Sequence, residues 1–430
     1  MIRTLLIVLL LALVASSAAA ATVTFEQALK RALQAHPSIA RARADLGAAV
    51  AQRRLARSAI LPRVDLDAAA LRNERTAAFD LGDGSTVTIQ PQDDWSSRLS
   101  LRQPLYVGGR ELKAIRQTEL SIDAAGAARE SAEEDVLFRT ASDYLAVVEA
   151  DALIDVEHQN VETAAARRAH AERMLAAGEF TKVDVLRAEA AEKAAERQLA
   201  AAEQQRVEAE SRLRLDLALD EDLVAVAPSF ALPPIPGVEE LTAVSMASHP
   251  DLERAAAYLG IARLETRKQR GALLPVVMLE ATIAKQRAAF PTDEARTVGV
   301  SIHVPVFDSG EIASRIAVAK ARETQIEASA AEARRAVREE IVAAVARLET
   351  ARKTFELAEE QLETAEAQHL QIAALYRSQE ATSLDMDVAE TALAEARRVF
   401  VVESLQTKIA ELRVWFAAGS LKSIVLEKEH

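Results

Sequence analysis

The 430-residue chain contains no cysteine, and only 4% of its residues are aromatic. The absence of cysteine excludes disulfide bonds, thiolate metal ligands, a cysteine nucleophile and an acylated lipoprotein N-terminus. Few aromatic residues and abundant alanine favour long helices over a compact mixed core. Acidic residues outnumber basic ones, 65 against 52, and the net charge is −13. We therefore expect no nucleic-acid partner, because phosphate binding needs a basic surface.

Residues 1–21 have the pattern of a secretory signal peptide. Arg3 precedes an apolar run from Leu5 to Val14, and small residues follow to the end of the segment. An uncleaved anchor helix is the alternative, but the run is too short to span a bilayer by itself. No later stretch reaches 18 consecutive apolar residues. We therefore expect export from the cytoplasm, and any membrane-spanning part must be made of strands.

The remaining chain contains two copies of one unit. The 27 positions from His36 to Pro62 align without a gap with His249 to Pro275, at an offset of 213 residues, and 13 of them are identical. Farther on the offset is 201 residues, since Pro104 answers to Pro305. The first copy therefore has 12 extra residues between Pro62 and Pro104. Gly, Asp, Thr and Pro cluster there, which predicts a loop over residues 82–91.

The repeat predicts the domain organisation. Repeat 1 covers residues 22–220 and repeat 2 covers residues 238–430, with a Pro-rich linker at 221–237. Each repeat begins with a helix that is interrupted at a His-Pro pair. Alternating apolar and polar residues then predict two pairs of strands, at about 62–106 and 274–307. Long segments without proline follow and predict helical hairpins at about 110–219 and 310–419.

The lengths of these elements predict an assembly. The first helix of each hairpin has about 70 residues and would extend roughly 105 Å, so it must pack along other helices as a coiled coil. Strands of about ten residues suit a tilted membrane strand. Four strands cannot close a barrel, and open edges in hydrocarbon leave costly unpaired backbone groups. Two copies of the chain would give eight strands around a filled interior, whereas three would give 12 strands and a polar lumen. We therefore expect a homotrimeric channel-tunnel, with strands in an outer membrane and helices in the periplasm.

At this point the residues resemble a known family, the TolC-type outer-membrane efflux proteins. The segment Gln103–Arg110 and its counterpart Val304–Gly310 are similar to the strand-to-helix turns of that family. The segment Thr181–Glu189 is similar to the turn between the long helices at the periplasmic tip. The turn residues that carry this resemblance are Pro104, Gly108, Gly109, Pro305 and Gly310.

The resemblance implies a fold that is mainly α with a small β part. Long antiparallel coiled-coil helices would form an α-barrel, and four strands per chain would contribute to a 12-stranded trimeric transmembrane β-barrel. It also implies a passive exit duct of a tripartite efflux pump or a type I secretion system. The partners would be a periplasmic adaptor protein, an inner-membrane transporter and outer-membrane lipid.

The resemblance also indicates pore and gate residues at the tip. Asp385 matches an acidic position that rings the closed entrance in the family, and a second family aspartate would fall at Val388, one position after Asp387. Tyr376 matches a tyrosine that holds the gate shut. The gate arginine would fall at Ala381, and Arg377 is the substitute we consider. The remaining candidates belong to the two tip turns: Asp184, Thr181 and Thr382.

Simpler functions remain open for these residues. Asp184 and Asp385 each follow a threonine by three positions, which is also the pattern of a helix cap. No catalytic constellation is present, and we expect neither catalysis, nor a cofactor, nor a metal site. A periplasmic coiled-coil adaptor or scaffold of an export complex is the alternative function. Such a protein would have one hairpin between β-rich halves, whereas both halves of this chain have a hairpin and a strand pair.

Overall fold

The computed structural model describes residues 21–426 except 83, 85, 222, 228–231, 288–293 and 379. The predicted signal peptide thus lies outside the described residues, apart from Ala21. The described chain divides into two compact units. Unit 1 comprises residues 1–42, 129–250 and 334–430, and unit 2 comprises residues 43–128 and 251–333. Each unit therefore combines parts of both sequence repeats, because the longest helices run through both units.

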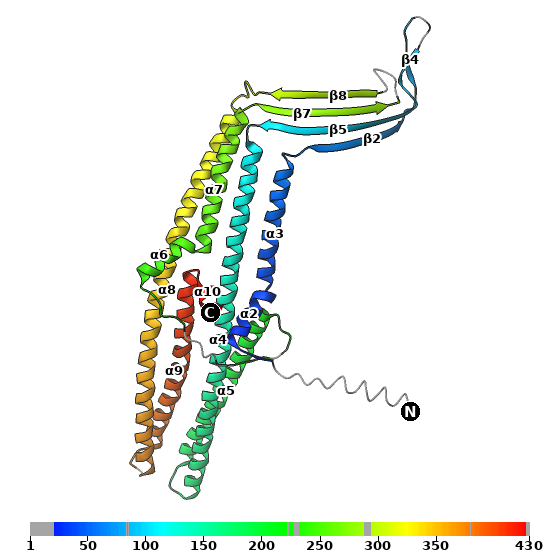
Figure 1. Ribbon diagram of the computed structural model, residues 1–430. Helices are drawn as coiled ribbons and strands as arrows, with labels where there is room; N and C mark the ends of the chain where they lie inside the picture. The colour runs from blue at the N-terminus through cyan, green and yellow to red at the C-terminus, as the bar shows by residue number, and fades with distance from the viewer. Residues whose placement is uncertain are drawn as a thin grey trace, which may run out of the picture. The chain divides into compact units, whose positions relative to one another are not determined.

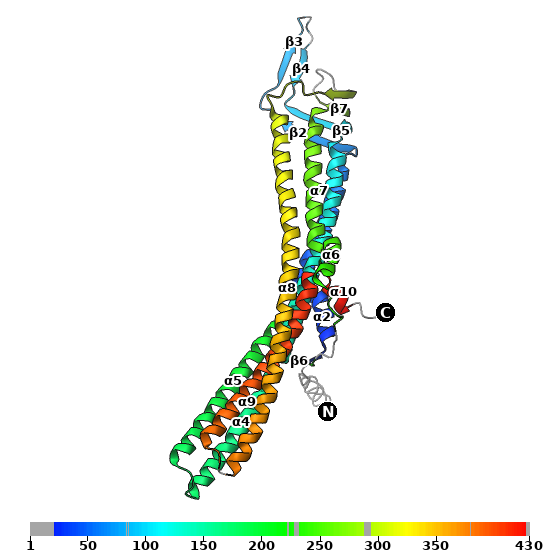
Figure 2. The ribbon, with the colours of Figure 1, turned by 90° about the vertical axis from the view of Figure 1, so that its left-hand side faces the viewer.

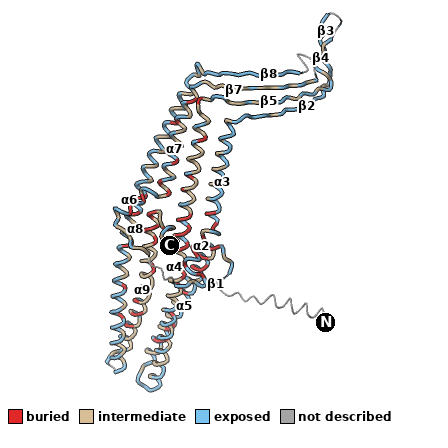
Figure 3. Tube along the Cα trace, in the orientation of Figure 1, coloured by how far each residue is buried: buried red, intermediate tan, exposed pale blue. Residues whose placement is uncertain are grey.

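Unit 2 contains a four-stranded antiparallel sheet in the order β2-β5-β7-β8. Its strands are β2 (Arg63–Arg72), β5 (Asp93–Val107), β7 (Val276–Gln286) and β8 (Glu294–His303). These are the four strands that the alternating pattern predicts, and Figure 1 shows them side by side. β5 joins β7 in the middle of the sheet, so the two repeats meet there. Figure 3 shows that the sheet is largely exposed.

Four helical segments of unit 2 connect to this sheet. α3 (Pro37–Ser58) precedes β2, and α7 (Pro250–Arg270) with a 3₁₀ turn (Gly271–Leu273) precedes β7. α4 (Arg110–Ala176) follows β5, and α8 (Glu311–Arg377) follows β8. α4 and α8 each have 67 residues, or about 100 Å at 1.5 Å per residue. They contain no proline, and only Gly126 of α4 is a glycine.

The prediction of a loop over residues 82–91 is wrong for part of that range. β4 (Thr86–Gln90) lies inside this range and pairs with β3 (Ala77–Asp80), which precedes it, in a small two-stranded sheet. Gly82 and Gly84 have positive φ angles between these strands, which turns the chain back on itself. Polar and apolar residues do alternate at Thr86–Gln90, but the segment is short and turn-forming residues flank it, so the pattern does not distinguish it from a loop.

Unit 1 contains the distal halves of α4 and α8 together with the helices that return from them. α5 (Lys182–Leu217) follows α4, and α9 (Ser383–Ala417) follows α8. The remaining elements are short: β1 (Ala21–Val23), α2 (Phe25–Ala35), β6 (Leu223–Ala225), α6 (Val238–Ser248) and α10 (Leu421–Leu426). In both views, α5 runs back beside α4 and α9 beside α8 (Figures 1 and 2). β6 lies within the predicted linker at 221–237, so that segment is not entirely irregular.

The core of unit 1 centres on Tyr144, which is fully buried on α4. Its ring contacts the Phe25 ring edge-on at 5.4 Å. Its hydroxyl accepts a hydrogen bond from the Val226 N–H at 3.0 Å, and lies 2.9 Å from the carbonyl oxygen of Val23. Val23 ends β1, which pairs in parallel with β6. One side chain therefore fastens the beginning of repeat 1 to the segment that connects the repeats.

Interhelical ion pairs add to this core. Arg168 of α4 binds Glu192 of α5 at 2.7 Å, and Arg398 of α9 binds the buried Glu157 of α4 at 3.2 Å. An alanine-rich interface brings helices close together but buries little area per residue, so long side chains at its edges contribute both packing and charge. Among the described residues, no helix combines the length and apolarity needed to cross a bilayer.

Candidate functional site

The strand register gives the unit 2 sheet two chemically different faces. One face is mostly apolar. In one row across all four strands, Val64 pairs with Leu101, Leu101 with Ala281 and Ala281 with Val298. The other face carries hydroxyl and charged groups. Asp67 lies opposite Arg98, and Arg102 lies opposite Glu280. Opposite charges on directly opposed residues stabilise a strand pair.

The apolar face is exposed in the protomer. Leu66 is 70% exposed, Val298 78% and Ile302 67%. An apolar surface of this kind on a sheet marks contact with a protein or a lipid phase. The outer strands β2 and β8 each pair on one side only within the described residues, so both margins of the sheet offer unpaired backbone groups.

The strand-to-helix turns include the glycines that the sequence singled out. Gly108 and Gly109 have φ angles of +66° and +67°, a conformation that favours glycine. A Cβ atom on Gly108 would lie 2.1 Å from the carbonyl oxygen of Gly271, so glycine is required there for the turn to meet the 3₁₀ segment before β7. In repeat 2, Ser309 and Gly310 have φ angles of +54° and +85°, and a Cβ on Gly310 would meet nothing within 4 Å.

Pro104 and Pro305 do not occupy equivalent structure. Pro104 lies within β5, at a register shift in the pairing with β7, where a residue without an N–H is tolerated. Pro305 follows the end of β8. The two residues after it, Val306 and Phe307, are 92% and 87% exposed, whereas their repeat-1 counterparts Leu105 and Tyr106 are 55% and 45% exposed.

The tip turns of unit 1 contain the predicted capping residues. Thr181 N–H donates to Asp184 Oδ2 at 3.0 Å, and the Thr181 hydroxyl donates to the same oxygen at 2.7 Å. Thr382 and Asp385 repeat this arrangement at 2.8 and 2.6 Å. The hydrogen bonds from the threonine side chain and backbone hold the pKa of each aspartate below its ordinary value. Both carboxylates therefore carry a negative charge at neutral pH, and both cap a helix.

Asp184 also connects the two tip turns. Its Oδ1 atom accepts a hydrogen bond from the Ser383 hydroxyl of repeat 2 at 3.1 Å. Tyr376 lies nearby, with its ring centroid 6.0 Å from the His170 ring and 6.4 Å from the Phe180 ring. Burial raises the pKa of the Tyr376 hydroxyl, with Asp184 among the neighbouring charges. Residues of both repeats therefore meet at this end of unit 1.

Arg377, the substitute considered for the gate arginine, bonds within its own helix. Its Nε atom donates to the carbonyl oxygen of Ala373 on the same helix at 3.0 Å. Arg167 of α4 binds Asp387 and Glu390 of α9, the latter at 2.5 Å, and its side chain is only 13% exposed. The sequence does not indicate this contact, since the partners are more than 200 positions apart and only the fold brings them together. Asp387, the acid next to the unmatched Val388, is therefore already paired.

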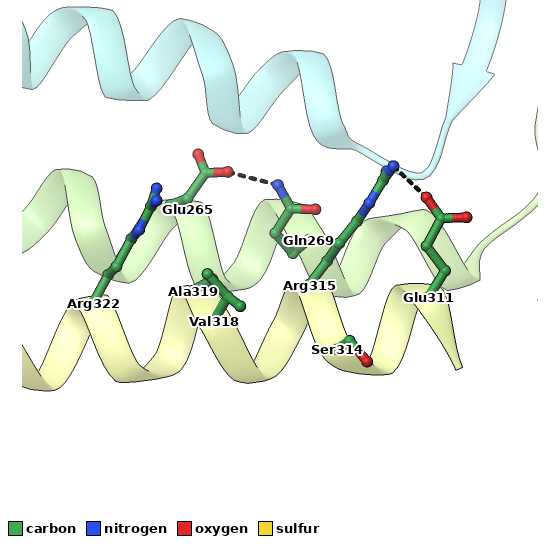
Figure 4. Close-up of a pocket in the computed structure, with 8 residues that line it drawn as sticks. All are labelled: Glu265, Gln269, Glu311, Ser314, Arg315, Val318, Ala319 and Arg322. Atoms are coloured by element: carbon green, nitrogen blue, oxygen red, sulfur yellow. Dashed lines mark hydrogen bonds and ion pairs between the residues drawn. The ribbon is translucent and has the colours of Figure 1, made fainter. Parts of the chain in front are cut away.

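Two hollows accompany these helices. One, of about 340 Å³, lies in unit 1 beside Arg167, Glu157 and Arg398, whose charges are paired as described. The other, of about 470 Å³, lies in unit 2 between α7 and α8 (Figure 4). There Arg315 pairs with Glu311, and Glu265 accepts from Gln269. Within the described ranges, no three His, Cys, Asp or Glu side chains form a metal-binding group.

A family model described as outer membrane efflux protein matches residues 28–218 and 243–420. The chain belongs to the outer membrane efflux protein family. The matched ranges include both helical hairpins and all four long strands. Membership favours the channel function over the adaptor function, and it confirms the resemblance seen in the sequence.

A curated protein and several solved structures are similar to this chain at low sequence identity. The outer membrane efflux protein BepC of Brucella suis is 22% identical over 288 residues, which are 66% of this chain and 63% of BepC. The chain thus matches less than two thirds of the length of BepC. The crystal structure of VceC from Vibrio cholerae superposes with a TM-score of 0.79 at 19% identity, covering 92% of this chain and 96% of VceC. The open state of the Neisseria gonorrhoeae MtrE outer membrane channel gives 0.78 at 18% identity, covering 92% and 89%.

These superpositions confirm the predicted fold class. Each covers more than nine tenths of the chain, and the solved chains are outer membrane proteins. The mainly helical fold with a small β part is therefore that of outer membrane channels.

Proposed function

We propose that this protein is an outer-membrane channel-tunnel that acts as a passive exit duct. The observation that carries the proposal is the four-stranded sheet, which has an exposed apolar face, a polar face and two outer strands that each pair on one side only among the described residues. Such a sheet is unfavourable in water because of its apolar face. It is also unfavourable in hydrocarbon because of its unpaired edges. Other copies of the chain that complete the sheet inside a membrane would remove both costs, because strand pairing satisfies the edges and lipid covers the apolar face.

Three copies suit a conduit best. Closing the sheet with two copies gives eight strands, whose interior side chains fill the space inside. Three copies give 12 strands and room for a polar lumen. The apolar face would then contact lipid, and the polar face, with Asp67, Arg98 and Glu280, would line the lumen. The helices would continue the duct in the periplasm, with the strands in the outer membrane.

The tip of unit 1 is the proposed entrance. Asp184 and Asp385 are ionised, and in a trimer each would be present three times around one axis. Tyr376 and the Asp184–Ser383 hydrogen bond would help hold the tip turns together. A passive duct needs an energy source elsewhere, so we propose a periplasmic adaptor and an inner-membrane transporter as partners, in a tripartite efflux pump or a type I secretion system. No cofactor and no catalytic step belong to this function.

The proposal is tested by fractionation and by electrical recording. The protein should sediment with the outer membrane as a heat-labile trimer and should form ion-conducting pores in planar bilayers. Recovery as a monomer in the soluble periplasmic fraction, without pore formation, would refute the proposal.

The role of the tip acids is tested in the same bilayers. Asp184→Ala with Asp385→Ala should lower the preference for cations, because six carboxylates leave the entrance of a trimer. Glu203→Ala is a matched control, since Glu203 is an exposed acid on α5 away from the tip turn. Unchanged selectivity in the double variant would leave only helix capping for the two aspartates.

A further inference from the structure

The His-Pro junction of each repeat packs against the end of a returning helix in unit 1. His36 caps the end of α2, and its Nε2 atom lies 3.6 Å from Oδ1 of Asp216 in the last turn of α5. In repeat 2, a Cβ on Gly419 just after α9 would lie 3.0 Å from Cδ2 of His249, which caps the end of α6. The two junctions occupy corresponding places, so repeat 2 can be compared with repeat 1 position by position.

The interiors of the two junctions differ in chemistry. Repeat 1 has three polar side chains there, Thr140 and Asp143 of α4 and Asp216 of α5. Their counterparts at the offset of 201 residues are apolar and buried: Ile341, Ala344 and Ala417. Apolar residues therefore suffice to pack this place in the fold. Carboxyl groups buried in their stead cost free energy unless they are hydrogen-bonded.

A hydrogen bond joins the carboxyl groups of Asp143 and Asp216. Ionised carboxylates only accept hydrogen bonds, so this bond requires a proton on one of the two groups. With both groups ionised, the buried Oδ2 atom of Asp216 has no hydrogen-bond partner among the described residues. The hydroxyl of the fully buried Thr140 near it is without a partner there as well. A proton on Asp143 supplies the donor that the Asp216 oxygen lacks.

His36 does not replace this proton. Its Nδ1 atom accepts the Ser38 N–H at 3.1 Å, so the neutral imidazole carries its hydrogen on Nε2, facing Asp216. A charged imidazole would carry a hydrogen on Nδ1 too and would lose the bond to Ser38. Burial also lowers the pKa of His36, and Arg139 acts in the same direction. The imidazole therefore stays neutral while it holds Ser38.

The charges around the pair also differ between the repeats. Arg212 of α5 lies 4.0 Å from Asp143, and Arg139 of α4 faces the pair as well. Their counterparts in repeat 2 are Arg413 and Glu340, which bind each other at 2.9 Å. Repeat 1 thus has two cations where repeat 2 has an ion pair, and it holds negative charge inside, in the two aspartates.

Burial and the mutual repulsion of the acids outweigh the two arginines. Burial and the Asp216 carboxylate raise the pKa of Asp143 to about 6, although both arginines act in the opposite direction. Burial raises the pKa of Asp216 as well. A folded-state pKa above the ordinary 3.8 means that the docked junction binds a proton more tightly than an opened one. Docking is therefore strongest at acidic pH and weakens as the pH rises through about 6.

We propose that Asp143 and Asp216 share one proton that fastens the His-Pro junction of repeat 1 and the end of α5 to α4, and that loss of this proton at higher pH loosens the junction. The segments held there are the first elements of repeat 1. Arg31 of α2 donates to the Leu217 carbonyl oxygen of α5 at 3.1 Å, and Tyr144, the next residue of α4, contacts β1. The packing of this part of unit 1 thus responds to periplasmic pH, however many copies of the chain assemble.

Hydrogen exchange of the full-length protein in detergent tests the proposal. The peptides to follow cover residues 31–42 and 212–219, which contain the junction and the end of α5. At each pH, wild type is compared with Asp143→Asn, which can donate a hydrogen bond but does not titrate. With pKa values of 3.8 opened and about 6 docked, the ratio of their protection factors should fall roughly tenfold from pH 5 to pH 8.

The internal repeat supplies a second variant. Asp143→Ala with Asp216→Ala gives repeat 1 the residues of repeat 2, and it should fold because Ala344 and Ala417 pack buried at the corresponding positions. Its protection relative to Asp143→Asn should not change with pH, and it serves as the reference if Asp143→Asn does not fold. Asp155→Asn is the matched control, since Asp155 is an exposed aspartate on the same helix. The ratio of wild type to this control should stay constant.

The sign of the change separates the acid pair from His36. The lowered pKa of His36 would make the junction loosen as the pH falls, which is opposite to the effect of the acid pair. A ratio of wild type to Asp143→Asn that falls towards pH 8 supports the shared proton. A constant ratio, a rise towards pH 8, or a fall that Asp155→Asn gives equally would overturn the proposal.

Discussion

Glu134 of α4 offers a quantitative test of the packing in unit 1. It is 7% exposed, and its two carboxylate oxygens accept the N–H groups of Leu421 at 3.0 Å and Lys422 at 3.1 Å. It thereby holds the first turn of α10. Burial raises its pKa from the ordinary 4.5 to about 7, although those two N–H groups act in the opposite direction.

The sign of the resulting pH dependence follows from the direction of this shift. A folded-state pKa above the unfolded value means that the docked state binds the proton more tightly than the opened state. The contribution of Glu134 to docking therefore increases as the pH falls from about 7 towards 4.5. Between pH 8 and pH 5.5 the gain is about 2 kcal/mol, or roughly thirtyfold in the opening equilibrium, when opening fully hydrates the carboxyl group.

Hydrogen exchange of the peptide segment 420–426 measures this opening. Because intrinsic exchange rates also depend on pH, wild type is compared with Glu134→Gln at each pH. The ratio of their protection factors should change by roughly thirtyfold between pH 8 and pH 5.5, since glutamine does not titrate. Glu130 is an exposed neighbour on the same helix. The ratio of protection factors between wild type and Glu130→Gln should therefore stay constant between pH 8 and pH 5.5. Parallel profiles for wild type and Glu134→Gln would refute the assigned role of Glu134.

Four further substitutions, one of them a control, test three other features of the structure. Gly108→Ala should lower the thermal stability of the protein by several degrees, because the new Cβ would collide with the backbone at Gly271. Gly310→Ala is the control: its Cβ would have open space, so it should lower the melting temperature less. Equal losses would contradict the turn geometry. Tyr144→Phe should destabilise by about 1–3 kcal/mol in denaturant titration, because the buried hydroxyl that accepts from Val226 N–H is lost, and an unchanged midpoint would argue against that role. Arg167→Met should speed hydrogen exchange near Asp387 in α9, since two half-buried carboxylates lose their partner. Unaltered exchange there would contradict a stabilising role for this contact.

The sequence predicts the long elements of this fold well because their signals are long. The break at Gly178 ends α4 within two residues of the prediction, and alternation over ten residues finds β2 and β8. Short elements escape such patterns. β3 has four residues and β6 has three, too few for periodicity to distinguish a strand from a loop.

In the candidate site, too, contacts between sequence neighbours are predictable from the sequence, whereas contacts between distant residues are not. The caps at Thr181 and Thr382 are local, so spacing alone reveals the partner of each. The binding of Arg167 to Asp387 depends on how α4 and α9 pack, and the burial of Glu134 depends on the docking of α10. No local sequence pattern indicates either contact, because the partner of each residue is determined only by the tertiary fold. The internal repeat is an exception among long-range signals, since it shows which positions of the two halves correspond.

Native mass spectrometry of the detergent-solubilised protein shows whether copies of the chain complete the sheet, because it counts the chains in one particle. We predict three chains per particle at concentrations where weak association is lost. A folded single-chain particle would contradict the trimeric channel, since it would show that the outer strands β2 and β8 need no second copy.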